Sequence, residues 1–181
     1  MATLVPLSAV DSELVEQLLD AAFGEQRHAR TAYRIREGVD FLPAMSFAVL
    51  DEEDYLAGSI QLWPVALTDP KGRPHPLIMV GPVAVVPGRQ GEGFGKALMA
   101  ASLGAIDAAF DQGAPPFPQV LIGDPEYYGQ WGFNADHTGG WHCPGPFERE
   151  RLLVRTSNPG ILPPEGMLGP WTAETSDAAK D

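Results

Sequence analysis

The sequence predicts one domain of the α/β class, and three observations support this. The 181 residues are the length of one ordinary domain. A composition of 44% hydrophobic and 20% charged residues is typical of a folded globular protein. Segments with apolar residues at helical spacing alternate with short apolar runs typical of strands, and no repeat or linker separates two cores. We therefore expect one domain over residues 1–172 and a disordered polar tail at residues 173–181.

The chain begins with a predicted edge strand and a helix. Residues 3–7 are mostly apolar, and Pro6 cannot donate to a ladder on both sides, which favours an edge position. Ser8, followed three residues later by Asp11, indicates a helix N-cap with an acidic first turn. Apolar residues at helical spacing continue as far as Gly24, where we expect the helix to end.

A basic helix and a hairpin are expected next. Residues 27–36 contain four arginines and form a plausible helix, which Gly38 stops. Two apolar runs, residues 45–51 and 55–67, flank an acidic turn and predict an antiparallel hairpin. Turn-forming residues at 68–76 then lead into the next strand.

The middle of the chain predicts a strand, a glycine-rich loop and a helix in direct succession. Residues 77–86 form an apolar run, interrupted by Gly81-Pro82, that is typical of a central strand. Residues 87–95 are rich in glycine, and residues 95–110 have an apolar stripe at helical spacing.

The remaining predicted elements are short. Residues 119–122 form a buried strand, and Asp124 caps a short helix with Pro125 at its first position. Residues 151–156 are the last expected strand.

Charge and cysteine content exclude several classes of protein. The 12 basic and 24 acidic residues give a formal net charge of −12, which disfavours nucleic-acid and anionic-membrane binding and favours a cationic partner such as an amine. Cys143 is the single cysteine, so a disulfide scaffold is excluded and a reducing compartment is indicated. No apolar stretch reaches the roughly 18 residues of a membrane span, and the start has no basic signal-peptide region. We therefore expect a cytoplasmic protein.

The glycine-rich loop is the segment that carries chemistry. Glycines let a backbone turn its N–H groups inward, and the first turn of the following helix has unpaired N–H groups and a positive dipole end, so an anion such as pyrophosphate is the natural ligand. A P-loop ending at Lys96 would need glycine at position 90, which is Gln90. A dinucleotide-binding fingerprint starting at Gly91 or Gly93 fails at Lys96 or Leu98.

The pattern that fits is Gln90-x-x-Gly93-x-Gly95 between an apolar strand and a helix. It resembles the acetyl-CoA loop of the GNAT superfamily of N-acetyltransferases. A second match lies downstream, where residues 128–133 resemble that superfamily's Tyr-x-x-x-Gly-Phe segment. The longer phrase at residues 123–133 is similar to the bacterial YhbS-like branch.

The resemblance implies a mixed, strongly twisted sheet of about six to seven strands with helices on both faces and a splay between strands four and five. Residues 77–86 and 119–122 would be those two strands. Free main-chain groups of Val83, Ala84 and Val85 would then pair with the pantetheine arm. The amides that would hold the pyrophosphate are those of Gln90, Gly91, Glu92, Gly93, Phe94, Gly95 and Lys96.

By the same resemblance, Tyr128 would donate a proton to the departing CoA thiolate, while Tyr127 would point elsewhere, into packing. Superfamily members often carry a glutamate base on the fourth strand, but residues 77–86 contain no carboxylate or histidine. A water relay to a distant group, or an amine that arrives deprotonated, would replace it. The possible relay ends are Glu126, Asp124, His28 and His75.

These expectations define the predicted function as direct acetyl transfer from acetyl-CoA to a primary amine of a small molecule or peptide, with no metal. The alternatives are a non-catalytic acyl-CoA-binding or sensor module, and transfer of another acyl group or to a hydroxyl. The arginine-rich segment at 27–36 argues instead for an acidic acceptor, although a solvated face is the more frequent reading. Cys143, His142 and His137 lack the paired spacing of zinc sites. A homodimer through the C-terminal strand region is possible.

Overall fold

The computed structural model describes residues 2–180, and the chain divides into two compact units. The first unit comprises Met1–His28, Phe41–Leu62 and Val80–Pro115, and the second comprises Ala29–Asp40, Trp63–Met79 and Pro116–Asp181. The long strands β3 (Leu56–Thr68) and β4 (Pro74–Val85) contribute residues to both units. Each unit contains a cluster of buried hydrophobic side chains.

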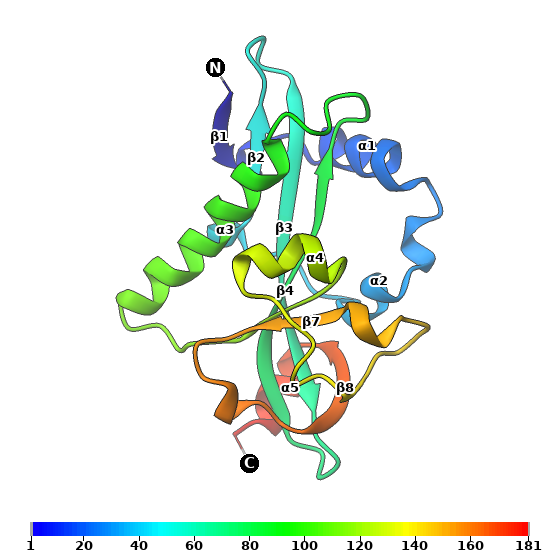
Figure 1. Ribbon diagram of the computed structural model, residues 1–181, viewed down its shortest axis with the longest axis vertical. Coiled ribbons are helices and arrows are strands. Elements are labelled where there is room, and N and C mark those ends of the chain that lie inside the picture. The colour runs from blue at the N-terminus through cyan, green and yellow to red at the C-terminus, as the bar shows by residue number, and fades with distance from the viewer. Residues whose placement is uncertain (1, 181) are drawn as a thin grey trace. The chain divides into compact units, whose positions relative to one another are not determined.

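The first unit contains the predicted edge strand and hairpin. Strand β1 (Thr3–Pro6) pairs antiparallel with β2 (Phe47–Leu50), which pairs antiparallel with the N-terminal part of β3. The order in this unit is β1-β2-β3-β4 (Figure 1). Asp54, with a φ of 64°, lies in the acidic turn that joins β2 to β3.

Two long helices cover opposite faces of the first unit's strands. Helix α1 (Ser12–Phe23) buries Leu18 and Leu19 in a core that includes Ala48 of β2. Helix α3 (Phe94–Asp111) covers the other face. A Cβ at Gly58 would contact both Leu98 of α3 and Val49 of β2, so Val49 faces α3. Neighbouring strand residues point to opposite faces, and Ala48 therefore faces α1.

The N-cap of α1 is Asp11, whose Oδ1 accepts a hydrogen bond from the Glu13 amide at 2.9 Å. Ser8 lies instead in a 3-10 turn, η1 (Leu7–Ala9). The predicted cap is therefore one turn too early, because Leu7 is buried and its amide is held by the Ser46 carbonyl.

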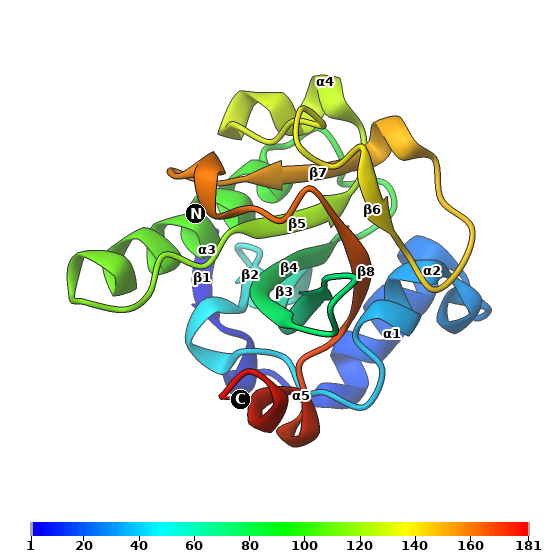
Figure 2. The same cartoon turned by 90° about the horizontal axis from the view of Figure 1, so that it is seen from below.

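The second unit is built around β5 (Gln119–Ile122), which pairs parallel with β4 and antiparallel with β7 (Leu152–Arg155). Strand β8 (Glu165–Pro170) pairs antiparallel with β3, and β6 (Gly140–His142) pairs parallel with β8 (Figure 2). The sequence does not predict β6 or β8, so β7 is not the last strand.

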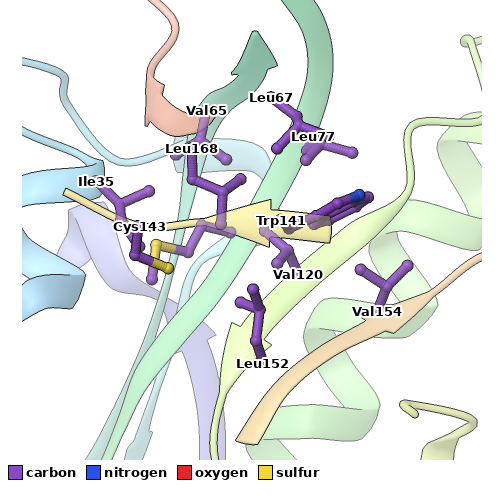
Figure 3. Close-up of a cluster of buried hydrophobic side chains, with 11 residues drawn as sticks. Ile35, Val65, Leu67, Leu77, Val120, Trp141, Cys143, Leu152, Val154 and Leu168 are labelled. Atoms are coloured by element: carbon purple, nitrogen blue, oxygen red, sulfur yellow. The ribbon is translucent and has the colours of Figure 1, made fainter. Parts of the chain in front are cut away.

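The core of the second unit surrounds Trp141 of β6, which is fully buried and donates its indole N–H to the Pro163 carbonyl at 2.8 Å. Figure 3 shows the cluster around this strand: Ile35 of α2 (Thr31–Ile35) lies beside Cys143, and side chains from several strands lie around Trp141. The buried members of the cluster are Ile35, Val65, Leu67, Leu77, Met79, Val120, Trp141, Cys143, Leu152, Val154 and Leu168.

Two predicted segments differ from the structure. The expected helix at 27–36 is a 3-10 turn, η2 (Arg27–Ala29), followed by the short α2. The tail expected to be disordered contains α5 (Ala173–Ala178), because the Thr172 hydroxyl caps it by accepting from the Thr175 amide; Asp181 lies outside the described residues.

The remaining short elements are α4 (Pro125–Tyr128) and the 3-10 turns η3 (Pro43–Met45), η4 (Gly129–Trp131), η5 (Arg149–Arg151) and η6 (Pro159–Ile161). Among residues 2–180, none of the helices combines the length and the apolar character that crossing a membrane requires.

Candidate functional site

The glycine-rich loop runs from the end of β4 into α3, both of which form where the sequence predicts them. Gly88, Gly91 and Gly93 have φ angles of 92°, 86° and 90°, which L side chains rarely adopt. A Cβ at any of the three would meet nothing within 4 Å. These glycines are therefore required by the backbone conformation, and their Cα atoms face open space.

The loop presents a row of unpaired amides. Gly93 is the N-cap of α3, and no side chain caps this 18-residue helix. Across residues 2–180, no hydrogen bond has an amide N–H of Gln90 to Lys96 as its donor. Unpaired N–H groups at the positive end of a long helix bind anions, so this loop fits a phosphate or pyrophosphate.

Arg89 holds this loop through its side chain. Its Nε and Nη2 donate to the two carboxylate oxygens of Glu92 at 3.0 and 3.1 Å, and its Nη1 donates to Asp51 at 3.0 Å. The same guanidinium lies 5.0 Å from the ring centroid of Phe94. Hydrogen bonding to Arg89 lowers the pKa of Glu92 below its usual value. Two carboxylates pair with Arg89, whereas Lys96 is exposed and forms no salt bridge with any of residues 2–180.

The strand before the loop has one edge that β3 does not use. The parallel pairing of β4 with β5 covers only Ile78 and Met79. Toward β3, the Val86 amide donates to the Ala57 carbonyl at 2.9 Å, and the Ala84 carbonyl lies against Gly58. Because main-chain groups alternate along a strand, those of Val83 and Val85 point toward the opposite edge.

The Tyr-x-x-x-Gly-Phe segment is a capped helical turn. At its start, Asp124 Oδ1 accepts from the Glu126 amide at 3.0 Å, as predicted, and Pro125 occupies the first position. At its end, the Phe133 amide donates to the Tyr128 carbonyl at 3.4 Å, and the Gly132 amide donates to the Gly129 carbonyl at 3.0 Å.

These two bonds, together with a left-handed Gly132 at φ 91°, form a Schellman motif. That motif also brings the first and last residues of the segment together, and the rings of Tyr128 and Phe133 have centroids 6.3 Å apart. The spacing of tyrosine, glycine and phenylalanine in this sequence is therefore the spacing of a helix C-cap.

The Tyr128 ring is partly buried at the end of β5. It packs against Gly123, where a Cβ would lie 2.4 Å from Cε2 of the ring, and edge-on against Tyr127 at a centroid distance of 4.9 Å. Burial raises the pKa of Tyr128 above its usual value of 10. Among the described residues 2–180, none donates to or accepts from its hydroxyl. Tyr128 is thus a protonated phenol at neutral pH with its hydroxyl uncommitted.

Residues 5–135 of the chain match the family model for the acetyltransferase (GNAT) domain. This match covers well over half of the chain. The chain belongs to the GNAT family of acetyltransferases. The family resemblance inferred from the two motifs is confirmed.

Solved structures with the same fold agree with this membership. YhbS from Escherichia coli in complex with CoA superimposes with a TM-score of 0.69 at 20% identity, covering 94% of this chain and 89% of that one. A GNAT acetyltransferase from Brucella melitensis in complex with acetyl-CoA gives 0.64 at 23% identity, covering 100% and 99%. Eis1 from Mycobacterium abscessus gives 0.52 at 17% identity, covering 75% and 31%. A comparison with curated proteins found no match.

In this GNAT domain, the prediction that the arginines of residues 27–36 form a solvent-exposed face is wrong for Arg27 and Arg36. Arg27 is 3% exposed and forms ion pairs with Asp20 and Glu16 of α1. Arg36 is 5% exposed, and its guanidinium carbon lies 4.0 Å from the Tyr33 ring centroid and 4.1 Å from that of Trp63. Arg27 contacts carboxylates of α1 and Arg36 contacts Trp63 of β3, and helical spacing within residues 27–36 cannot reveal these contacts between elements.

Three side chains that the sequence analysis named, Cys143, His75 and Tyr127, are buried or contact neighbouring side chains in this domain. Cys143 is buried, which raises the pKa of its thiol to about 11. His75 lies in β4, with Nε2 3.0 Å from the Asp69 carboxylate. Tyr127 is 38% exposed and packs its ring on Tyr128 and Trp131. Within the part of the chain described, no cluster of three histidine, cysteine or acidic side chains is arranged to hold a metal ion.

Proposed function

We propose that this GNAT domain transfers an acetyl group directly from acetyl-CoA to a primary amine of a small molecule or peptide. The observation that carries the proposal is the row of unpaired amides from Gln90 to Lys96 at the start of α3. The complexes of the E. coli and B. melitensis proteins with CoA and acetyl-CoA support the choice of ligand.

The residues of the loop and of β4 fit acetyl-CoA. The amides of Gln90 to Lys96 would hold the pyrophosphate, assisted by the Lys96 ammonium, in the open space beside Gly91 and Gly93. Main-chain groups of residues 83–85 would hold the amide-rich pantetheine arm in the manner of an added strand. We assign the pairing to Val83 and Val85, because the Ala84 carbonyl lies against Gly58 of β3.

Acetyl-CoA supplies an activated acetyl thioester. A main-chain N–H of residues 83–85 that the pantetheine arm does not engage would stabilise the negative charge that develops on the thioester carbonyl oxygen during attack by the amine. Tyr128 would donate its phenolic proton to the CoA thiolate as it leaves. The raised pKa keeps this phenol protonated over the whole physiological range, so the donor form is always present.

The acceptor amine must lose a proton before it attacks. Between Pro74 and Val85, β4 carries no carboxylate, and its one histidine, His75, interacts with Asp69. Asp124 is occupied as a helix cap. We propose that water removes the proton or that the amine arrives neutral, which predicts that the rate rises with pH as the free amine becomes more abundant.

The test is a CoA-release assay over a panel of amines, combined with calorimetric titration of CoA. Turnover of at least one amine supports the proposal. Tyr128→Phe should lower kcat by about 100-fold or more while the Kd for CoA stays the same. Tyr127→Phe is the matched control, because its ring is the exposed neighbour, and should leave kcat nearly unchanged.

A second candidate is a non-catalytic acyl-CoA-binding module. The absence of a carboxylate from residues 77–86, at β4 and just after it, favours this module. It predicts tight binding of acetyl-CoA with no CoA release for any amine in the panel, so one pair of measurements separates the two functions.

A further inference from the structure

The carbonyl at the end of the Tyr128 turn has a side-chain partner on a distant strand. Arg155 of β7 donates its Nε–H to the Trp131 carbonyl at 3.1 Å. This carbonyl belongs to the last turn of the helical segment, where main-chain oxygens lack partners within the helix. Arg155 therefore caps the C-terminal end of the turn whose N-terminal end is capped by Asp124.

The arginine that makes this contact is itself held in place. Its Nη1 donates to Gln119 Oε1 at 2.8 Å, and Gln119 and Arg155 are direct partners in the β5–β7 register. Gln119 is 5% exposed and donates its own side-chain amide to the Phe117 carbonyl. The hydrogen bond to Gln119 thus fixes the position of the guanidinium that contacts the turn.

Main-chain hydrogen bonds to β7 also attach the chain just after the Tyr128 turn. The Asn134 amide donates to the Val154 carbonyl at 3.1 Å, and the Val154 amide donates to the Asn134 carbonyl at 2.9 Å. Gly132 lies close by, since a Cβ there would be 3.9 Å from Arg155 Cγ. The end of the Tyr128 turn is therefore attached to β7 on both sides of Phe133, and Figure 2 shows α4 beside β7.

We propose that Arg155 is a positioning residue for Tyr128: by capping the Trp131 carbonyl from the β5–β7 pair, it fixes the turn that carries the phenol, the proposed proton donor. The inference rests on the proposed function, because it assigns Arg155 a role only through the proton donor. A lysine at position 155 has one ammonium and not a planar fork, so it cannot reproduce both contacts in the same geometry.

The consequence of losing this cap is a mobile turn with an intact fold. The Schellman motif and the Asp124 cap remain, so the helical turn still forms. Its attachment to β7 weakens, and misplacement of a catalytic group by about 1 Å can lower a rate by 100-fold. Arg155→Met should therefore lower kcat by about 10- to 100-fold, with an unchanged Kd for CoA.

A double-mutant cycle on the full chain tests the inference. The variants are Tyr128→Phe, Arg155→Met and their combination, each measured for kcat, Kd for CoA and melting temperature. If Arg155 acts through the phenol, the double variant is no slower than Tyr128→Phe alone. Arg155→Lys should fall between wild type and Arg155→Met. Arg73→Met, at an exposed arginine in the turn before β4, controls for loss of a charge.

Additive losses in the double variant would overturn the inference, and so would an unchanged kcat in Arg155→Met. If Arg155→Met melts too far below wild type for kinetics, Arg155→Lys provides the same cycle with the charge retained. A Tyr128→Phe variant with wild-type kcat would instead remove Tyr128 from the mechanism. The failure of the proposed function is thus distinguishable from the failure of the positioning role.

Discussion

The ring of Tyr128 packs so closely on Gly123 that a Cβ at position 123 would lie 2.4 Å from Cε2 and 2.7 Å from Cδ2. Gly123 is the residue that follows β5, and its amide donates to the Arg151 carbonyl at 2.9 Å. No side chain larger than hydrogen leaves the ring in this position. The glycine at the end of the strand therefore determines where the phenol lies.

Gly123→Ala should displace the Tyr128 ring. We expect kcat to fall by about 10- to 100-fold and the free energy of unfolding to fall by about 1 to 3 kcal/mol. Steady-state kinetics and thermal melts measure the two effects. Gly139→Ala is the control, because a Cβ there meets nothing within 4 Å. Wild-type kcat in Gly123→Ala would show that the ring position is not needed for transfer.

Gly93→Ala tests the backbone conformation of the glycine-rich loop, the proposed pyrophosphate site. An alanine at φ 90° is strained by about 1 to 2 kcal/mol, so the loop should relax and the row of amides should lose its alignment. The Kd for CoA, measured by calorimetry, should rise. Gly113→Ala introduces comparable strain at φ 98°, beyond the other end of α3, with equally open space. It should lower the melting temperature and leave the Kd unchanged; equal affinity losses in both variants would contradict a role for the loop amides.

Arg89→Met removes the clamp between the loop and Asp51. We expect CoA affinity to weaken by about fivefold at most, because the Arg89–Glu92 pair is solvent-exposed, the Asp51 pair is only partly buried, and their role is to hold the amides in place.

The stabilising effect of this clamp should depend on pH. The pKa of Glu92 is lowered in the folded state, so the Arg89–Glu92 contribution is complete above pH 4.5 and is lost as pH falls through the lowered pKa. The melting-temperature difference between wild type and Arg89→Met should therefore shrink below pH 4. A difference that stays constant from pH 7 to pH 3 would exclude Glu92 as the partner that matters.

Cys143→Ala should retain activity within about twofold, since direct transfer needs no covalent acetyl-enzyme. The thiol has a pKa of about 11, raised by burial, so the thiolate is scarce at neutral pH. Stability should fall by about 1 kcal/mol through loss of a buried atom. Initial-rate patterns in both substrates check the mechanism: parallel lines with an inactive variant would indicate a covalent intermediate on Cys143.

Elements with strong local signals are predictable from this sequence. Asp124 and Pro125 specify the start of α4 through one side-chain oxygen and one fixed φ, both within three residues. The glycine-rich loop is also visible in the sequence, because glycine is the residue that tolerates the left-handed angles found there. Strands β6 and β8 carry no such signal: β6 has three residues, and β8 buries Leu168 alone in a segment that contains glycine and proline. They form because β3 presents a free edge to β8.

By itself, the sequence indicated the family, the glycine-rich loop between a strand and a helix, and the Asp124 cap of the turn that carries Tyr128, because each depends on residues a few positions apart. Only the tertiary structure decided that Arg27 and Arg36 are buried and that Arg155 caps a turn 24 residues before it. The physical reason is that a buried cation needs a partner to offset its desolvation, and these partners are supplied by other elements after the chain has folded.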